Sequence, residues 1–77
     1  MSGAPEARTA RVMLGVRGMD TDGARAKVTD ALLELRGVHG VEAGGGQSLL
    51  VRYDSSELTV MDMIRAVRRL GFLAGMA

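Results

Sequence analysis

The residues best suited to chemistry lie in one short segment, from Met19 to Asp22. Asp20 and Asp22 supply two carboxylates, and Thr21 between them supplies a hydroxyl. Oxygen donors suit hard cations such as Ca²⁺ or Mg²⁺, which require about six or more oxygen ligands. The thioether of Met19 is a ligand for soft ions, or else a packing residue. These four residues are the candidate metal ligands, and helix capping is the alternative role of the two aspartates.

The chain contains no cysteine, which excludes disulfides, thiolate metal sites and cysteine nucleophiles. No nucleophile–base pair is visible, so we expect neither an enzyme nor a bound cofactor beyond a weakly held metal ion. His39 is the single histidine. It follows the far end of an expected helix, about 20 Å from Met19, and is expected to be an exposed turn residue.

Composition narrows the class of protein further. The chain has 77 residues, enough for one domain, and a net charge of +1. Nucleic-acid binding is not expected, because a net charge of +1 attracts phosphates only weakly and only two aromatic residues are available for base stacking. No apolar run approaches the ~20 residues of a membrane span, and residues 1–9 lack the apolar core of a signal peptide. We therefore expect a cytoplasmic protein with no membrane contact.

The elements that position the candidate ligands follow from hydrophobic periodicity. Alternating apolar residues predict a strand from Ala10 to Arg17, ended by Gly18. A helix then begins at Thr21 or Asp22. Residues 1–9 are expected to form a disordered tail, and residues 10–77 one folded domain. The first helix is expected to bury the apolar stripe formed by Val28, Ala31, Leu32 and Leu35.

The second half of the chain repeats the pattern. Two short strands are predicted over residues 38–43 and 49–53, joined by a glycine-rich hairpin. Thr59 and Asp62 have the spacing of a capping box and open a second helix, which buries Val60, Met63, Ile64 and Val67. Residues 72–76 form a last strand. The order β-α-β-β-α-β predicts a ferredoxin-like sandwich of the α+β class, a four-stranded antiparallel sheet with two helices on one face.

These elements resemble the heavy-metal-associated domain, the module of copper chaperones and of the cytosolic tails of metal-pumping ATPases. The family begins with a strand, Gly-Met-x-Cys-x-x-Cys and a helix; residues 12–19 match the strand and its Gly-Met. Residues 35–41 are similar to the family's Leu-x-Gly-Val-x-x-Val turn. The third strand matches at residues 51–54, and the last helix and its exit match at residues 64–67 and 70–72.

The resemblance implies a metal-handling fold without its ligands. The two family cysteines fall on Thr21 and Ala24, and a hydroxyl and a methyl do not replace thiolates as ligands for Cu(I). The site end of the fold is expected to gather three turns, residues 18–24, 44–46 and 70–72, on which a partner protein can dock. The sequence predicts a protein-interaction or weak metal-contact module in metal homeostasis. The alternatives are a structural or regulatory interaction domain, including a homodimer, and metal binding through non-cysteine ligands.

Overall fold

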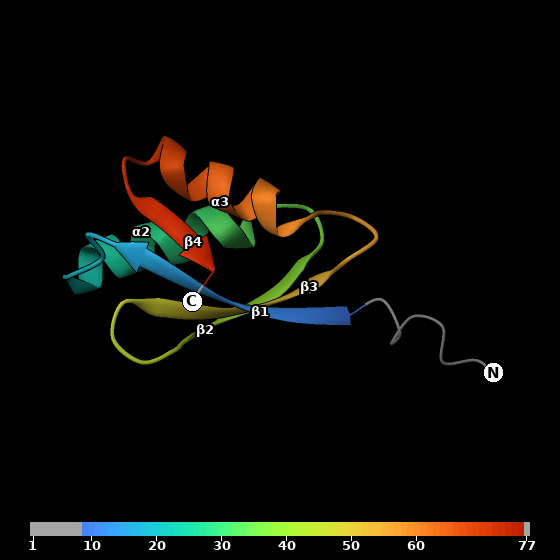
Figure 1. The fold of residues 1–77 in the computed structure, drawn as a ribbon, viewed down its shortest axis with the longest axis horizontal. Coiled ribbons are helices and arrows are strands. Elements are labelled where there is room, and N and C mark those ends of the chain that lie inside the picture. Colours follow the sequence, from blue (N-terminus) through green and yellow to red (C-terminus); the bar gives the residue numbers. More distant parts are fainter. Residues whose placement is uncertain (1–8, 77) are drawn as a thin grey trace.

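A computed structural model describes residues 9–76 of the chain. Its elements alternate in the predicted order β-α-β-β-α-β (Figure 1). They are β1 (Thr9–Arg17), α2 (Asp22–Leu33), β2 (Val38–Ala43), β3 (Ser48–Asp54), α3 (Val60–Arg69) and β4 (Leu73–Met76).

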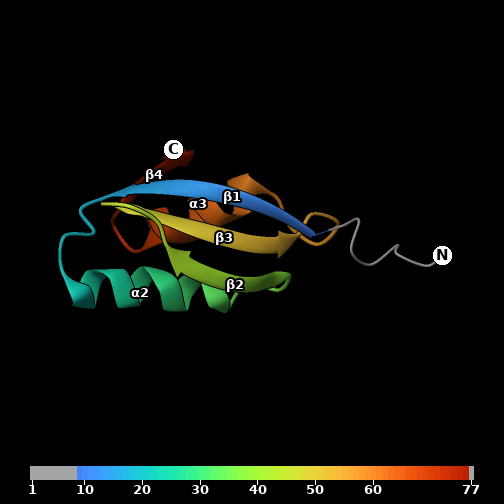
Figure 2. The ribbon, with the colours of Figure 1, turned by 90° about the horizontal axis from the view of Figure 1, so that it is seen from below.

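The four strands form one antiparallel sheet in the order β2-β3-β1-β4, which places the first strand at the centre (Figure 2). Both helices lie on the same side of this sheet (Figure 1). The predicted ferredoxin-like fold is therefore confirmed. The opposite face of the sheet carries no covering element within residues 9–76, and we call it the open face.

The helix starts agree with the capping residues expected from the sequence. Thr21 is the N-cap of α2, where its hydroxyl accepts a hydrogen bond from the backbone N–H of Ala24 (3.1 Å). Thr59 and Asp62 form a reciprocal capping box at the start of α3. Both helices are thus fixed at their first residue by side-chain oxygens that satisfy backbone N–H groups.

Element boundaries differ from the prediction by a few residues. The strand β1 begins at Thr9, within the segment expected to be a tail, and the rest of that segment, residues 1–8, lies outside the described residues. Helix α2 ends at Leu33, so Leu35 leaves the helix and packs on the core from the following turn. The chain turns here because Gly37, like Gly71 after α3, has φ +98°, a conformation that favours glycine.

The core lies between the helices and the covered face of the sheet. Its side chains are almost entirely aliphatic, as the shortage of aromatic residues predicts. No helix within the described range is long and apolar enough to span a membrane. The buried residues are Val12, Leu14, Val16, Met19, Val28, Leu32, Leu49, Val51, Tyr53, Leu58, Met63 and Val67.

Candidate functional site

The four candidate ligands do not converge on one point. Asp20, Thr21 and Asp22 are exposed on the turn between β1 and α2, whereas Met19 is completely buried. Its thioether belongs to the hydrophobic core beneath the turn. A buried thioether and three exposed oxygen-bearing side chains therefore point to different environments, and the structure places Met19 as a packing residue.

Two of the three oxygen-bearing side chains on the turn interact with the start of helix α2. Thr21 caps the helix, and Asp22 is the acidic residue of its first turn. A carboxylate at this position interacts favourably with the partial positive charge of the helix N-terminus. Within residues 9–76 there is no group of three or more His, Cys, Asp or Glu side chains that could hold a metal ion. His39 is exposed, as expected, but it lies on strand β2 and not in a turn.

The positions that the resemblance assigns to the family cysteines are nevertheless neighbours in space. Thr21 is the N-cap and Ala24 is the third residue of α2, the relation that a capping box exploits. Side chains at these two positions lie on the same side of the helix start. The hydroxyl and the methyl present here do not fit a soft ion, because polarisable sulfur donors are what such an ion requires.

Gln47, which the sequence did not identify, fixes the β1–α2 turn from the neighbouring β2–β3 turn. Its side-chain carbonyl oxygen accepts hydrogen bonds from the backbone N–H of Gly18 (2.9 Å) and of Met19 (3.2 Å). Gln47 stands just after the glycine-rich hairpin, next to β3. One side chain thus ties the β1–α2 turn to the β2–β3 turn.

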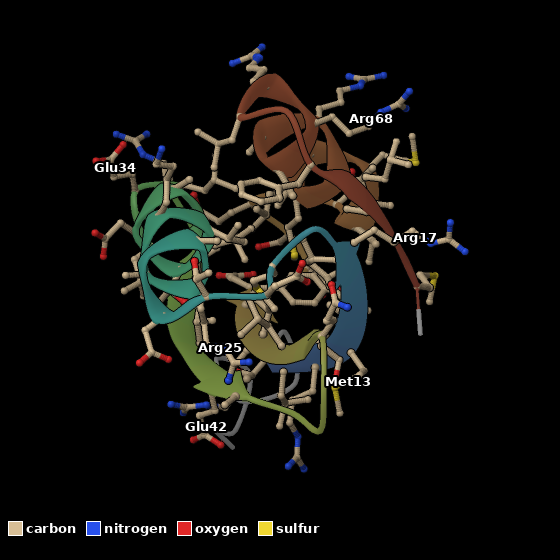
Figure 3. All side chains as sticks on the ribbon, turned by 90° about the vertical axis from the view of Figure 1, so that its left-hand side faces the viewer. Met13, Arg17, Arg25, Glu34, Glu42 and Arg68 are labelled. Atoms are coloured by element: carbon tan, nitrogen blue, oxygen red, sulfur yellow. The ribbon has the colours of Figure 1, made fainter. Side chains whose placement is uncertain are left out.

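Arg25 makes a second link between the same two turns. Its guanidinium donates to the backbone carbonyl of Gly46 (3.2 Å), and its side chain points from α2 toward the hairpin (Figure 3). In the structure the guanidinium is half-buried and hydrogen-bonded to the protein itself.

The third turn adjoins the first through Phe72. The ring of Phe72 lies so close to Gly18 that a Cβ at this position would be 3.3 Å from the ring carbon Cδ1. Gly18 also has φ +93°, a conformation that favours glycine, and a Cβ would in addition require a small shift of the Phe72 ring. Residues 18–24, 44–46 and 70–72 therefore gather at one end of the fold, as the sequence predicted, and we call them the loop surface.

Solved structures of metal-handling proteins share this fold. The chain is similar to oxidized MerP from Ralstonia metallidurans CH34, with a TM-score of 0.83 and 23% identity over 88% of this chain and 96% of the other. It is similar to the N-terminal domain of a potential copper-translocating P-type ATPase from Bacillus subtilis, solved in the Cu(I)-loaded state, with a TM-score of 0.82 and 22% identity over 88% and 86%. The CopZ metallochaperone gives a TM-score of 0.80 and 25% identity over 86% and 100%.

No protein-family model and no curated protein sequence matches the chain. The similarity is therefore structural, and it extends over almost the whole described range. The resemblance read from the sequence is confirmed at the level of the fold. The chain has the ferredoxin-like fold of heavy-metal-associated and copper-binding domains, in a sequence that contains no cysteine.

Proposed function

We propose that this protein is a non-catalytic interaction module of metal homeostasis that contacts a partner protein through the loop surface. The fold supports the setting, because solved structures with the same architecture are described as a metallochaperone and as a copper-translocating ATPase domain. The chemistry of the loop surface supports interaction rather than transport of an ion, because no sulfur ligand is exposed on it.

The observation that carries the proposal is the cross-bracing of the three turns. Gln47 and Arg25 hold the β1–α2 and β2–β3 turns together, and Phe72 packs against Gly18. A surface whose backbone is fixed in this way loses little conformational entropy when a partner binds. It is preorganised for contact although it does not present the ligands of a soft metal.

The exposed side chains indicate what kind of partner fits. Asp20 and Asp22 are the charged residues of residues 18–24, and the hairpin beside them contributes glycines. Residues 18–24 therefore present two negative charges to solvent, with the guanidinium of Arg25 beside them at Gly46. A basic patch on the partner would complement these negative charges, accelerate association and orient the complex.

Chemical-shift mapping by NMR tests this proposal. The labelled protein is titrated with the isolated heavy-metal-associated domains of metal-pumping ATPases encoded in the same genome. We expect amide shifts confined to the loop surface, and an affinity that falls about tenfold or more when Asp20→Lys and Asp22→Lys are combined. Asp30→Lys, an exposed aspartate on the body of α2, is the matched control and should bind normally. Shifts that map elsewhere, or charge reversal without effect, would refute the loop surface.

Weak metal contact through Met19, Asp20, Thr21 and Asp22 is the alternative use of the same loop. Titration with Cu(I), Zn(II) and Ca(II) separates the two functions, because each ion would shift the amides of residues 18–24 if these side chains bound it. Saturation at micromolar concentration would establish metal binding by this loop. No response to any of the three ions would exclude metal binding and favour the interaction module.

A second candidate function is a homodimeric module without a role in metal handling. One observation favours it: Met13 and Leu50 are direct partners across the β1–β3 ladder. Both lie on the open face, where Met13 is 36% exposed. An adjoining apolar pair on an uncovered sheet is a candidate contact surface. Sedimentation that stays monomeric at high concentration would eliminate this function.

A further inference from the structure

The two edges of the sheet are protected to different degrees. At one edge, β2 carries His39 and Glu42 and has an irregular register between Val38 and Gly40. Charged residues and bulges at an edge prevent pairing with other chains. At the other edge, β4 has the sequence Leu-Ala-Gly-Met, which contains no charge and no proline. By the criteria of charge, proline and bulges, β4 is the less protected edge.

The side chains of β4 are also unusually exposed for apolar residues. Leu73 is 61% exposed and Met76 is 70% exposed, the two highest values among the large hydrophobic residues of the described range. Leu73 is the register partner of Arg17, so it stands on the open face. Two exposed apolar side chains within a four-residue edge strand are a concentrated contact surface.

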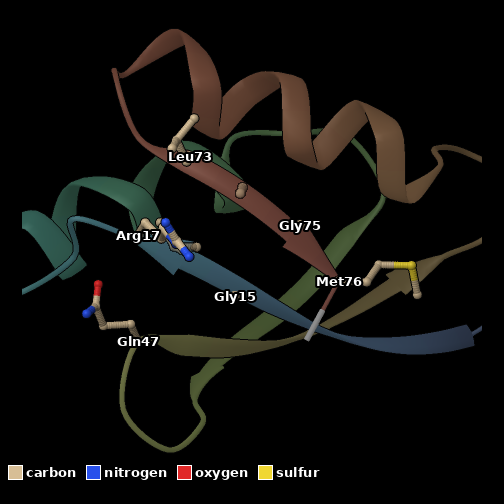
Figure 4. Close-up of a pocket in the computed structure, with 8 residues that line it drawn as sticks. Gly15, Arg17, Gln47, Leu73, Gly75 and Met76 are labelled. Carbon is tan, nitrogen blue, oxygen red and sulfur yellow. The ribbon is translucent and has the colours of Figure 1, made fainter.

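Beside Leu73 the open face is hollow. Gly75 is the register partner of Gly15, so neither strand supplies a side chain at this row (Figure 4). The hollow has a volume of about 390 Å³ and is bordered by Arg17, Gln47, Leu73 and Met76. It is broad and shallow, which suits a side chain from a neighbouring chain.

Other glycines of the sheet show what is missing at Gly75. Arg52 of β3 lies over Gly40, its register partner on β2, and the sulfur of Met13 would be 2.7 Å from a Cβ on Gly44. Each of these glycines is covered by a long side chain from another strand. A Cβ on Gly75 would meet nothing within 4 Å among the described residues. The φ of Gly75 is not positive, so the backbone conformation does not explain this glycine either.

A second copy of β4 supplies the missing side chain. Residues 73 and 75 are two apart and lie on the same face of the strand. If two copies pair antiparallel about Ala74, Leu73 of each copy faces Gly75 of the other. It can then cover both glycines of the row formed by Gly75 and Gly15. On the covered face, Met76 of each copy falls opposite the half-buried Phe72 of the other. The strand is therefore complementary to itself.

Charge does not oppose this arrangement. Each Arg17 lies on β1, one strand inside the edge, so the two guanidinium groups end up at opposite ends of the contact. We propose that two copies of this protein associate through antiparallel β4–β4 pairing, which joins their sheets into one, with Leu73 of each copy seated over Gly75 of the other. A contact of two four-residue strands is small, so we expect a dissociation constant between ~10 μM and ~1 mM.

Sedimentation equilibrium and concentration-dependent amide NMR of the described domain test the proposal. We expect a monomer–dimer equilibrium in the stated range, with the amides of β4 and Arg17 shifting as the concentration rises. In a sample of mixed labelled and unlabelled protein, isotope-filtered NOEs should connect the Leu73 methyl groups to the α-protons of Gly75. A protein that stays monomeric up to ~1 mM overturns the proposal.

Two variants distinguish this contact from any other. Gly75→Val fills the hollow in open space, so the monomer should fold at least as well, while the dissociation constant rises about tenfold or more because Leu73 is excluded. The exchanged variant, Leu73→Gly with Gly75→Leu, restores the complementarity and should restore the dimer. Met61→Lys is the control for loss of an exposed apolar residue, since Met61 is 51% exposed on α3, and it should dimerise normally.

The outcomes separate this inference from the loop surface and from the Met13–Leu50 pair. A dimer that survives Gly75→Val, or that Leu50→Lys abolishes while Gly75→Val does not, contradicts β4 pairing. Neither result affects binding at residues 18–24. Conversely, loss of the loop-surface interaction leaves the β4 prediction as it stands.

Discussion

Met19 is completely buried beneath the β1–α2 turn, whereas Asp20, Thr21 and Asp22, the next residues along the chain, are exposed to solvent. The fold as a whole is similar to MerP, to a domain of a potential copper-translocating ATPase and to the CopZ metallochaperone, with TM-scores of 0.80 to 0.83. The turn itself carries no thiolate, since the chain contains no cysteine.

This difference shows that the fold and the metal site depend on different free energies. Burial of a Val, Leu or Met side chain contributes about 1.5–3 kcal/mol, and all of the core residues except Tyr53 are of these types. The two ligand positions contribute a helix cap and a small half-buried methyl group. The residues at these two positions can therefore change without loss of the fold.

The largest expected effect comes from the core side of this comparison. Leu32→Ala removes a fully buried side chain from α2 and should lower the free energy of unfolding by about 2–5 kcal/mol, enough to unfold much of the protein. Denaturant titration followed by circular dichroism measures the change. Leu33→Ala, at a neighbouring residue that is 48% exposed, is the control and should change little. Equal effects of the two variants would mean that the buried face of α2 is misassigned.

Loss of the hydrogen bonds from Gly18 and Met19 to Gln47 should have the next largest effect on stability. Gln47→Ala removes the acceptor for two backbone N–H groups, of which that of Met19 is partly buried, and should cost about 1–3 kcal/mol. Gln47→Glu keeps a carbonyl-type oxygen and should largely preserve these hydrogen bonds. Amide hydrogen exchange at Gly18 and Met19 reports the loss locally. Unchanged protection in Gln47→Ala would show that the turn is held by other contacts.

The smallest expected effect lies in the loop itself. Thr21→Ala removes the N-cap of α2 and should cost about 1 kcal/mol, whereas Thr21→Ser retains the hydroxyl and should be close to neutral. Thermal unfolding of the three proteins measures the difference. If Thr21→Ala lowered the stability as much as Leu32→Ala does, the conclusion that the core and not the loop determines the fold would be contradicted.

Most of the fold was predictable because its signals are local. The alternation in β1, the apolar stripes of both helices and the capping box of Thr59 and Asp62 act within a few residues, and the structure confirms them. The end of α2 was predicted two residues late, because Leu35 continues the apolar period although it packs from the turn.

The contacts that shape the candidate site were not predictable in the same way. Gln47 binds residues 28 and 29 positions away, and no periodicity marks a long-range side-chain hydrogen bond. The hollow on the open face depends on the register that places Gly15 beside Gly75. Register between distant strands is set by the assembled sheet. The sequence alone therefore could not indicate that Gly15 and Gly75 lie side by side.

Cu(I) titration of the combined variant Thr21→Cys and Ala24→Cys against a competing chelator is the most direct test of the central claim, that the start of α2 can hold a soft ion once two sulfur ligands are supplied. The N-cap and the third residue of α2 already present their side chains on the same side of the helix start, so two thiolates there should bind one Cu(I) tightly while the parent protein binds none. A folded double-cysteine variant that takes up no copper would contradict the account, because the loop geometry would then have diverged together with its ligands.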